Sequence, residues 1–295
     1  MLSKSPAFLE CKKFVCVSDF HIPFQSDACL EALKQYLLYE KPDYVWLLGD
    51  VFDCLIVSKF TNIHVRYHDW EEERQASTIP FDFLDNAMDQ AGVKHKLYGA
   101  GNHEQRLPMY MALHADKINS PEFTIPTQFK LKERGIRYFD STCREGFFQK
   151  FTDKLSVSHG WISSGDNVAG LYLRKYPGMS YIVGHTHRAD NKRNGSPHLD
   201  NVCYVNGCMS LNATYKPLSN ETRGFTAGWV NMRTGDFDIF PIQIVGDHDE
   251  ERSPIIKSEN YVSKKDKPFH LYSPSLQIEV KKTAKRWQAS KPVAL

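Results

Sequence analysis

Short apolar runs that end in a carboxylate recur near the beginning of the chain. Residues 12–19 read Lys-Lys-Phe-Val-Cys-Val-Ser-Asp, and residues 44–50 read Tyr-Val-Trp-Leu-Leu-Gly-Asp. Apolar runs of this length predict buried strands. Between them, the apolar positions of residues 27–40 have helical spacing and predict a crossover helix. Strand, helix and strand in this order indicate an α/β fold with parallel strands.

The same pattern predicts the remaining elements. Helices are expected over residues 71–92, with a break at Pro80, and over 105–118 and 166–175, with a loop and a short helix at 119–135. Further strands are expected at 93–99, 136–139, 146–151, 154–158, 179–184, 202–206, 226–232 and 237–244. A polar segment at 246–254 follows the last strand. We therefore expect one domain over residues 1–250 and a C-terminal extension over residues 251–295.

Composition and charge fit a globular protein and say little about its partners. The 295 residues are 41% hydrophobic and 24% charged, with a formal net charge of +2. The charge is uneven, because residues 254–295 hold nine Lys/Arg against three Asp/Glu, a local +6 (9 − 3). No apolar run has the length of a membrane span, and the N-terminus lacks the apolar region of a secretory signal. These features predict a cytoplasmic protein.

The cysteines predict neither disulfides nor a zinc site. There are seven, an odd number, scattered along the chain without a Cys-x-x-Cys pair. This usage favours small buried side chains in a reducing compartment.

Five predicted strand ends carry residue types that bind metal ions. They are Asp19-Phe-His21, Gly49-Asp50, Gly101-Asn-His-Glu104, His159-Gly160 and Gly184-His-Thr-His187. A lone Asp-x-His or His-Gly is more often structural than functional. For His-Thr-His the two interpretations are about equal, because its alternate histidines would need a bend to converge. A buried carboxylate at a strand end is nevertheless costly unless it is paired or binds a metal. Ligands of open α/β sheets also bind at these ends, so the repeated pattern predicts one metal centre.

In this order the motifs resemble those of the calcineurin-like metallophosphoesterase superfamily. That family has D-x-H, G-D-x-x-D, G-N-H-[DE], a later H and G-H-x-H, matched here between residues 19 and 187. The resemblance implies an α/β fold, a four-layer α/β/β/α sandwich of two mixed sheets. Residues 18–24, 101–107, 206–208 and 215–218 further resemble small bacteriophage phosphoesterases. For a phage-encoded protein the expected location is the host cytoplasm.

The resemblance also implies two metal ions that share Asp50. One ligand set would be Asp19, His21, Asp50 and His187, and the other Asp50, Asn102, His159 and His185. Such mixed oxygen and nitrogen ligands suit Mn²⁺, which we favour, or Fe, Zn²⁺ or Ni²⁺, better than Ca²⁺. The implied function is hydrolysis of a phosphomonoester or phosphodiester by a hydroxide that bridges the two ions.

Residues beside the implied ligands have expected roles of their own. His103 would protonate the leaving oxygen or stabilise its charge, with Glu104 orienting it. Asp53 has two interpretations, as a partner of a ligand histidine or as a carboxylate at a helix N-terminus. Arg106 is a candidate for substrate phosphate, although a surface ion pair is the commoner role. Trp161, two residues after His159, is a second candidate substrate contact.

Two other functions remain open at the sequence level. Gly49-Asp-Val-Phe-Asp53 also resembles the matching motif of DNA repair nucleases, although little chain remains after residue 244 for a DNA-capping domain. A metal-binding scaffold without catalysis is the second alternative, and the complete motif set with His103 argues against it. The basic segment from Lys281 to Trp287 is a candidate contact for nucleic acid, with a solvated extension as the commoner role of such a tail. The expected partner is a phosphoester substrate, and no membrane.

Overall fold

The computed structural model describes seven segments of the chain and three further strands. The segments are residues 10–59, 67–114, 122–140, 143–163, 166–196, 199–211 and 220–245. The strands, for which the backbone is described, are β12 (Ile255–Lys257), β13 (Phe269–Ser273) and β14 (Leu276–Val280). The basic segment 281–287 lies outside the described residues.

A seven-stranded mixed sheet carries the first half of the motifs. Its order is β12-β11-β10-β1-β2-β3-β4, and β1 to β4 run parallel. The parallel strands are β1 (Cys11–Val17), β2 (Tyr44–Leu47), β3 (His95–Gly99) and β4 (Ile136–Phe139). On the other side of β1 lie β10 (Arg223–Asn231), β11 (Phe237–Val245) and β12, and each of these strands runs antiparallel to the strand before it in the sheet, starting from β1. The backbone pairing thus continues past residue 250, and the predicted domain boundary there stays a prediction.

A second mixed sheet of five strands carries the remaining motifs. Its order is β5-β6-β7-β9-β8, with β6, β7 and β9 parallel. The strands are β5 (Gln149–Lys150), β6 (Leu155–Ser158), β7 (Ser180–Val183), β8 (Asp190–Ser196) and β9 (Leu199–Val205). Among the described strands, β13 and β14 pair with each other, antiparallel, and with no third strand.

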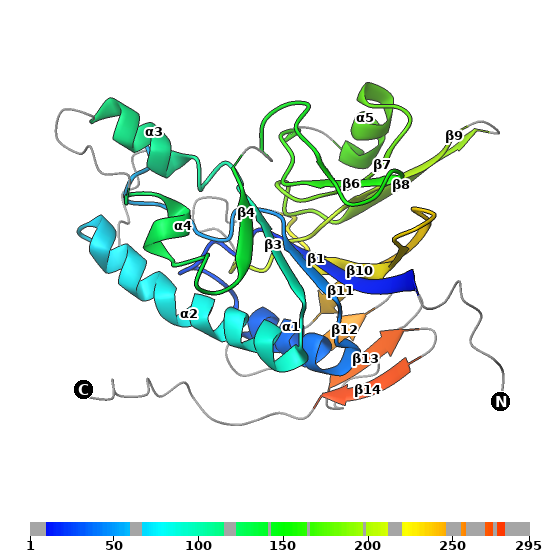
Figure 1. The fold of residues 1–295 in the computed structure, drawn as a ribbon, viewed down its shortest axis with the longest axis horizontal. Helices are drawn as coiled ribbons and strands as arrows, with labels where there is room; N and C mark the ends of the chain where they lie inside the picture. Colours follow the sequence, from blue (N-terminus) through cyan, green and yellow to red (C-terminus); the bar gives the residue numbers. More distant parts are fainter. Residues whose placement is uncertain are drawn as a thin grey trace.

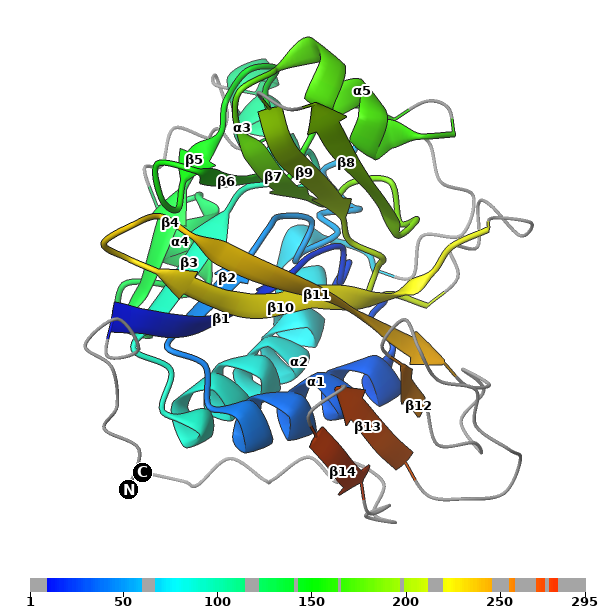
Figure 2. The ribbon, with the colours of Figure 1, turned by 90° about the vertical axis from the view of Figure 1, so that its right-hand side faces the viewer.

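Helices cover the outer faces of the two sheets (Figures 1 and 2). Helices α1 (Asp27–Glu40) and α2 (Trp70–Ala91) pack against the seven-stranded sheet. The apolar cluster between them includes Val15 and Leu47 of the sheet and Phe81 of α2. A second cluster, with Phe14 and Ile182, lies between the sheets. A third joins α5 (Val168–Lys175) to the five-stranded sheet. These four layers confirm the predicted α/β/β/α sandwich.

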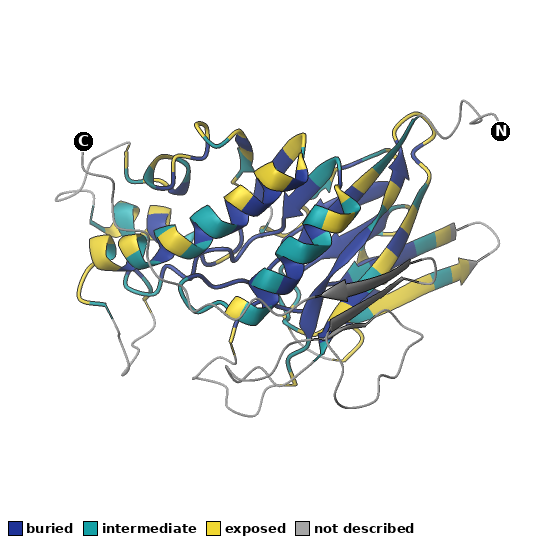
Figure 3. Cartoon of the chain, turned by 90° about the horizontal axis from the view of Figure 1, so that it is seen from below, coloured by how far each residue is buried: buried dark blue, intermediate teal, exposed yellow. Residues whose placement is uncertain are grey.

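Helix α1 begins and ends where its sequence predicts. The Ser26 side chain accepts a hydrogen bond from the backbone N–H of Cys29 at 3.3 Å, which caps the first turn. Lys41 ends the helix in the left-handed conformation. Figure 3 shows the partly exposed outer faces of α1 and α2 in front of strands that are mostly buried.

The predicted break at Pro80 is wrong, because α2 runs without interruption from Trp70 to Ala91. A proline inside a helix costs about 3 kcal/mol. The buried stripe of α2 includes Phe81, Leu84 and Met88, none more than 1% exposed. Each such side chain contributes about 1.5–3 kcal/mol on burial. Packing therefore outweighs the local preference.

Two short helices, α3 (Arg106–Leu113) and α4 (Ile125–Gln128), lie at the end of the sheet to which β3 points (Figure 1). The seven cysteines, all within the described residues, form no disulfide, and five are buried. Of the helices in the described segments, none combines the length and apolar character that crossing a bilayer requires.

Candidate metal centre

The strand ends of both sheets meet at one place, and glycines make the close approach possible. A side-chain methyl group on Gly101 would overlap the Asp50 carboxylate, and one on Gly184 would overlap Ser18 and lie 2.7 Å from Oδ2 of Asp19. The loop after β3 can therefore pack against the loop after β2, and the loop after β7 against the loop after β1, only with glycine at these positions.

The backbone at this place is strained in a consistent way. Five of the predicted ligands have positive φ angles, between 48° and 79°: Asp19, His21, Asp50, His185 and His187. Outside glycine this conformation is uncommon and costs about 1–3 kcal/mol per residue. The bend that the His-Thr-His motif needs is made by these angles, so both histidines turn towards the centre.

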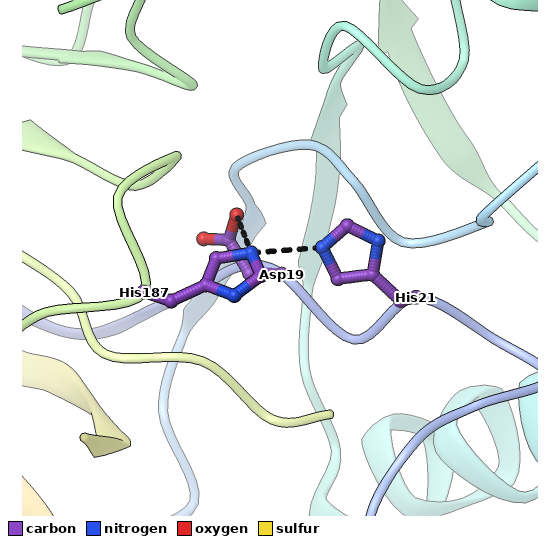
Figure 4. A group of neighbouring side chains, drawn as sticks. All are labelled: Asp19, His21 and His187. Atoms are coloured by element: carbon purple, nitrogen blue, oxygen red, sulfur yellow. Dashed lines mark hydrogen bonds and ion pairs between the residues drawn. The ribbon is translucent and has the colours of Figure 1, made fainter. Parts of the chain in front are cut away.

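The first group of side chains is Asp19, His21 and His187 (Figure 4). The Nε2 atoms of the two histidines are 2.9 Å apart. Nε2 of His187 lies 3.4 Å from Oδ1 of Asp19. Three potential ligand atoms thus face one small volume, as the first predicted ligand set requires.

The second group is Asp50, Asn102, His159 and His185. Nε2 of His159 lies 3.1 Å from Oδ1 of Asn102 and 3.2 Å from Nδ1 of His185. Oδ2 of Asp50 lies 3.4 Å from Nε2 of His159 and 3.9 Å from Nε2 of His21. This oxygen adjoins both groups, which is the position that a shared ligand needs.

The chemistry of the donors fits divalent cations. Asp19 is fully buried, and its Oδ1 makes no hydrogen bond to the described residues although it faces the imidazole of His187. A buried carboxylate oxygen without a donor is costly, and a cation between it and the two Nε2 atoms would remove that cost. The mixed carboxylate, amide and imidazole set suits a transition metal.

The charges of the centre also favour ionised carboxylates. Burial alone would raise the pKa of Asp19, but the close contact and positive charge of His187 lower it to about 2. For Asp50, the charges of His103 and His159 overcome burial and hold the pKa well below its usual range. Burial would lower the pKa of His159, yet the Asp50 carboxylate raises it to about 9. The acids are therefore ready to bind a cation, and His159 retains a proton that a metal would displace.

Family comparison agrees with this arrangement. The family model described as calcineurin-like phosphoesterase matches residues 12–189, which span every predicted ligand. The chain belongs to the calcineurin-like phosphoesterase family. The search of curated proteins finds no match.

Solved structures with a similar fold are distant in sequence from this family member. A Vps29 single mutant from Entamoeba histolytica is 16% identical, with a TM-score of 0.41 over 84% of this chain and 99% of its own. Vacuolar protein sorting 29 from Cryptosporidium parvum is 14% identical, with a TM-score of 0.45 over 85% and 100%. A PhoD structure is 9% identical, with a TM-score of 0.47 over 87% and 73%.

His103 of this family member lies beside the Asp50 carboxylate. Its Nε2 is 3.7 Å from Oδ2 of Asp50, and its Nδ1 is 2.9 Å from Oδ1 of Asp53. The same Asp53 oxygen lies 2.9 Å from Nδ1 of His21. Asp53 therefore orients two histidines at once, which agrees with the first of its two predicted roles.

Arg106 holds His103 from the other side. Its guanidinium donates to the carbonyl of Asp53 at 2.7 Å and lies 2.9 Å from Nε2 of His103. That contact suits a neutral ring with an unprotonated Nε2. Burial lowers the pKa of His103, but the charges of Asp50 and Asp53 outweigh it and raise the pKa. The protonated ring is thus accessible once the guanidinium turns away. Whether Arg106 contacts substrate stays a prediction.

Glu104 does not orient His103 in the way the sequence suggests. Its buried carboxylate accepts hydrogen bonds from the backbone N–H groups of Asp50, Val51, Phe52 and Gly101, at 2.7–3.0 Å. The hydroxyl of Tyr98 donates a fifth, at 2.6 Å. Its side chain therefore ties the loop that carries Asp50 to the loop that carries Asn102.

The loop after His159 is anchored by aromatic packing. The hydroxyl of Tyr172 accepts hydrogen bonds from the backbone N–H groups of Trp161 and Ile162, at 2.8 and 3.2 Å. The ring of Trp161 packs edge-on against Phe148 and Tyr172, with ring centroids 5.0 and 5.3 Å apart. This packing accounts for the aromatic residue structurally, and a substrate contact by Trp161 stays a prediction.

Sequence reasoning missed Glu221, which touches a predicted ligand. Its Oε1 lies 2.9 Å from Nδ1 of His187. Glu221 follows a segment outside the described residues, 212–219, and no motif marks it. Its one sequence signal is a polar run, residues 220–223, directly before the apolar part of β10.

Proposed function

We propose that the protein hydrolyses a phosphoester with two divalent metal ions, for which Mn²⁺ is our first choice. The observation that carries the proposal is the position of Oδ2 of Asp50, which adjoins both ligand groups and His103. When bound, the two cations would polarise the phosphoryl oxygens and supply an activated water for in-line attack.

The residues around that oxygen have separate tasks in this proposal. Asp19, His21 and His187 hold the first ion, Asn102, His159 and His185 hold the second, and Asp50 is shared. His103 donates a proton from Nε2 to the leaving oxygen, while Asp53 fixes its ring through Nδ1. A general acid of this kind contributes about 10²–10⁴ in rate.

Arg106 would change partner during the reaction. Its guanidinium lies against the nitrogen from which His103 must donate. A phosphate oxygen is a strong acceptor for a guanidinium. We propose that Arg106 turns to the substrate phosphate and so leaves Nε2 of His103 free to protonate the leaving group.

The test is to strip the protein with a chelator, restore Mn²⁺ and measure turnover. The substrates are an aryl phosphomonoester, an aryl phosphodiester and single-stranded DNA, which separate phosphatase, phosphodiesterase and nuclease. We expect metal-dependent turnover of at least one, with large losses in Asp50→Asn and His103→Ala. Metal analysis should give two ions per chain in the wild type and in His103→Ala.

Three outcomes would refute the proposal. Full activity in the chelator-treated protein, or in Asp50→Asn, would exclude the shared carboxylate as the centre of catalysis. Two bound ions with no turnover of any of the three substrates would instead favour a non-catalytic metal-binding scaffold.

A further inference from the structure

We propose that Glu221 is a positioning residue that makes the ion site of Asp19, His21 and His187 the tighter of the two metal sites. The proposal rests on the two metal sites of the proposed function but not on the reaction. We call the first site the Asp19 site and that of Asn102, His159 and His185 the Asn102 site.

The contact between Glu221 and His187 fixes both the ring and its tautomer. Oε1 of Glu221 lies 2.9 Å from Nδ1 of His187, and the Glu221 side chain is 4% exposed. A carboxylate can only accept a hydrogen bond at neutral pH, so Nδ1 must carry the proton. Nε2, the atom that faces Asp19 and His21, is then the nitrogen that would give up its proton and bind an ion. Glu221 therefore presents His187 as a ligand.

Glu221 is itself held in place by a buried cation. The guanidinium of Arg223, whose side chain is 2% exposed, lies 3.5 Å from Oε2 of Glu221. The same nitrogen lies 3.0 Å from the sulfur of Cys208. Fixing the carboxylate leaves the imidazole of His187 little freedom to rotate.

These side chains are a positioning network rather than a third metal site. Ligand atoms of His187, Cys208 and Glu221 lie within 4.8 Å of one another, which is compact enough for an ion. However, the guanidinium of Arg223 already contacts both the sulfur and the carboxylate. A metal ion there would have to lie against a buried positive charge at low dielectric, where like charges repel strongly.

The two metal sites differ in what supports their histidines. In the Asp19 site, Nδ1 of His21 contacts the Asp53 carboxylate and Nδ1 of His187 contacts the Glu221 carboxylate. In the Asn102 site, Nδ1 of His159 lies 2.7 Å from the backbone carbonyl of Leu48, a neutral acceptor. An anionic acceptor makes the opposite ring nitrogen a more basic ligand. The Asp19 site should therefore fill first.

The test is a calorimetric titration of the metal-free protein with Mn²⁺. We expect two classes of site in the wild type, and in Glu221→Ala an affinity of the tighter class lower by about 10–100-fold, with the weaker class unchanged. Glu221→Gln retains an acceptor for Nδ1 but no charge, so we expect a smaller loss. Glu145→Gln, an exposed carboxylate beside Lys175, is the matched control and should leave both affinities unchanged.

A single-site background assigns the effect to one site. In Asn102→Ala the Asn102 site loses a ligand, and the remaining affinity reports the Asp19 site. Adding Glu221→Gln to this background should weaken that affinity. Should Glu221→Ala fail to fold, Glu221→Gln decides, both alone and in the Asn102→Ala background. An unchanged affinity of the tighter class in Glu221→Gln, or a loss confined to the weaker class, overturns the proposal. If the Glu221 variants lose affinity at the tighter site as expected but the protein hydrolyses no phosphoester, the role of Glu221 is supported and only the proposed reaction is rejected.

Discussion

Glu104 offers the sharpest test of how the centre is built. One buried carboxylate accepts hydrogen bonds from four backbone N–H groups and one hydroxyl, and the side chain has no cationic partner among these contacts. Glu104→Gln keeps the size and shape of the side chain and replaces one acceptor oxygen by an NH₂ donor. It therefore isolates the hydrogen bonds from the packing.

The expected cost follows from the division of donors between the two oxygens. Oε1 accepts from Val51, Phe52 and Tyr98, whereas Oε2 accepts from Asp50 and Gly101. The amide nitrogen will take the place of Oε2, because this leaves two donors without an acceptor instead of three. Each buried unsatisfied donor costs about 1–3 kcal/mol. Removing a buried charge offsets part of this, so we expect a net loss of about 2–4 kcal/mol in the free energy of unfolding.

Urea denaturation of the metal-free proteins measures this loss. Glu145→Gln, in which the changed carboxylate is on the surface beside Lys175, serves as the control and should unfold like the wild type. Because the two freed donors belong to Asp50 and Gly101, Glu104→Gln should also bind Mn²⁺ more weakly. A loss below about 0.5 kcal/mol, the usual range of neutral surface changes, would refute the stabilising role of the Glu104 hydrogen bonds.

Three further changes test other parts of the structure. Gly101→Ala should abolish measurable Mn²⁺ binding, because its methyl group would overlap the Asp50 carboxylate; wild-type binding would contradict the packing. Burial raises the pKa of Glu73 to about 6, so the folded protein binds this proton more tightly than the unfolded chain. The stability of the wild type relative to Glu73→Gln should therefore fall by about 1.3 kcal/mol between pH 4.5 and 6, and by about 2 kcal/mol between pH 3.5 and 7. A constant or rising difference in urea denaturation would refute this. Tyr172→Phe should lower the free energy of unfolding by about 1–3 kcal/mol, because two partly buried N–H groups after His159 lose their acceptor; an unchanged urea midpoint would contradict it.

The strands and the polar residues at their ends could be predicted because they depend on local pattern, whereas the four layers were implied by the family resemblance. Apolar runs that stop at Asp19, Asp50 and His159 already contain both the strand and the polar residue at its end. Parallel pairing of β1 and β2 then brings Asp19 and Asp50 to one edge of the seven-stranded sheet. That His159 meets them from the other sheet was implied by the family resemblance. The ends of α1 were equally predictable, because Ser26 caps the helix locally.

The errors arise where distant contacts decide. Pro80 remains inside α2 because buried neighbours on the same face outweigh a local preference. Strand β8 was not predicted because Asp-Asn-Lys-Arg-Asn-Gly-Ser has no apolar alternation, and its place at the edge of the sheet requires none. Glu221 was missed because its role depends on meeting His187 across 34 residues.

The origin of the ligands has a consequence for how the chain matures. Asp19, His21, Asp50 and Asn102 follow strands of the seven-stranded sheet, whereas His159, His185 and His187 follow strands of the five-stranded sheet. Each proposed ion would thus bind side chains from both sheets, and neither sheet carries a complete set. During synthesis, a chain in which only β1 to β4 have formed lacks His159, His185 and His187 and has neither ligand set complete. Metal binding would then require that the two sheets have already packed together, and the bound ions would stabilise that packed state.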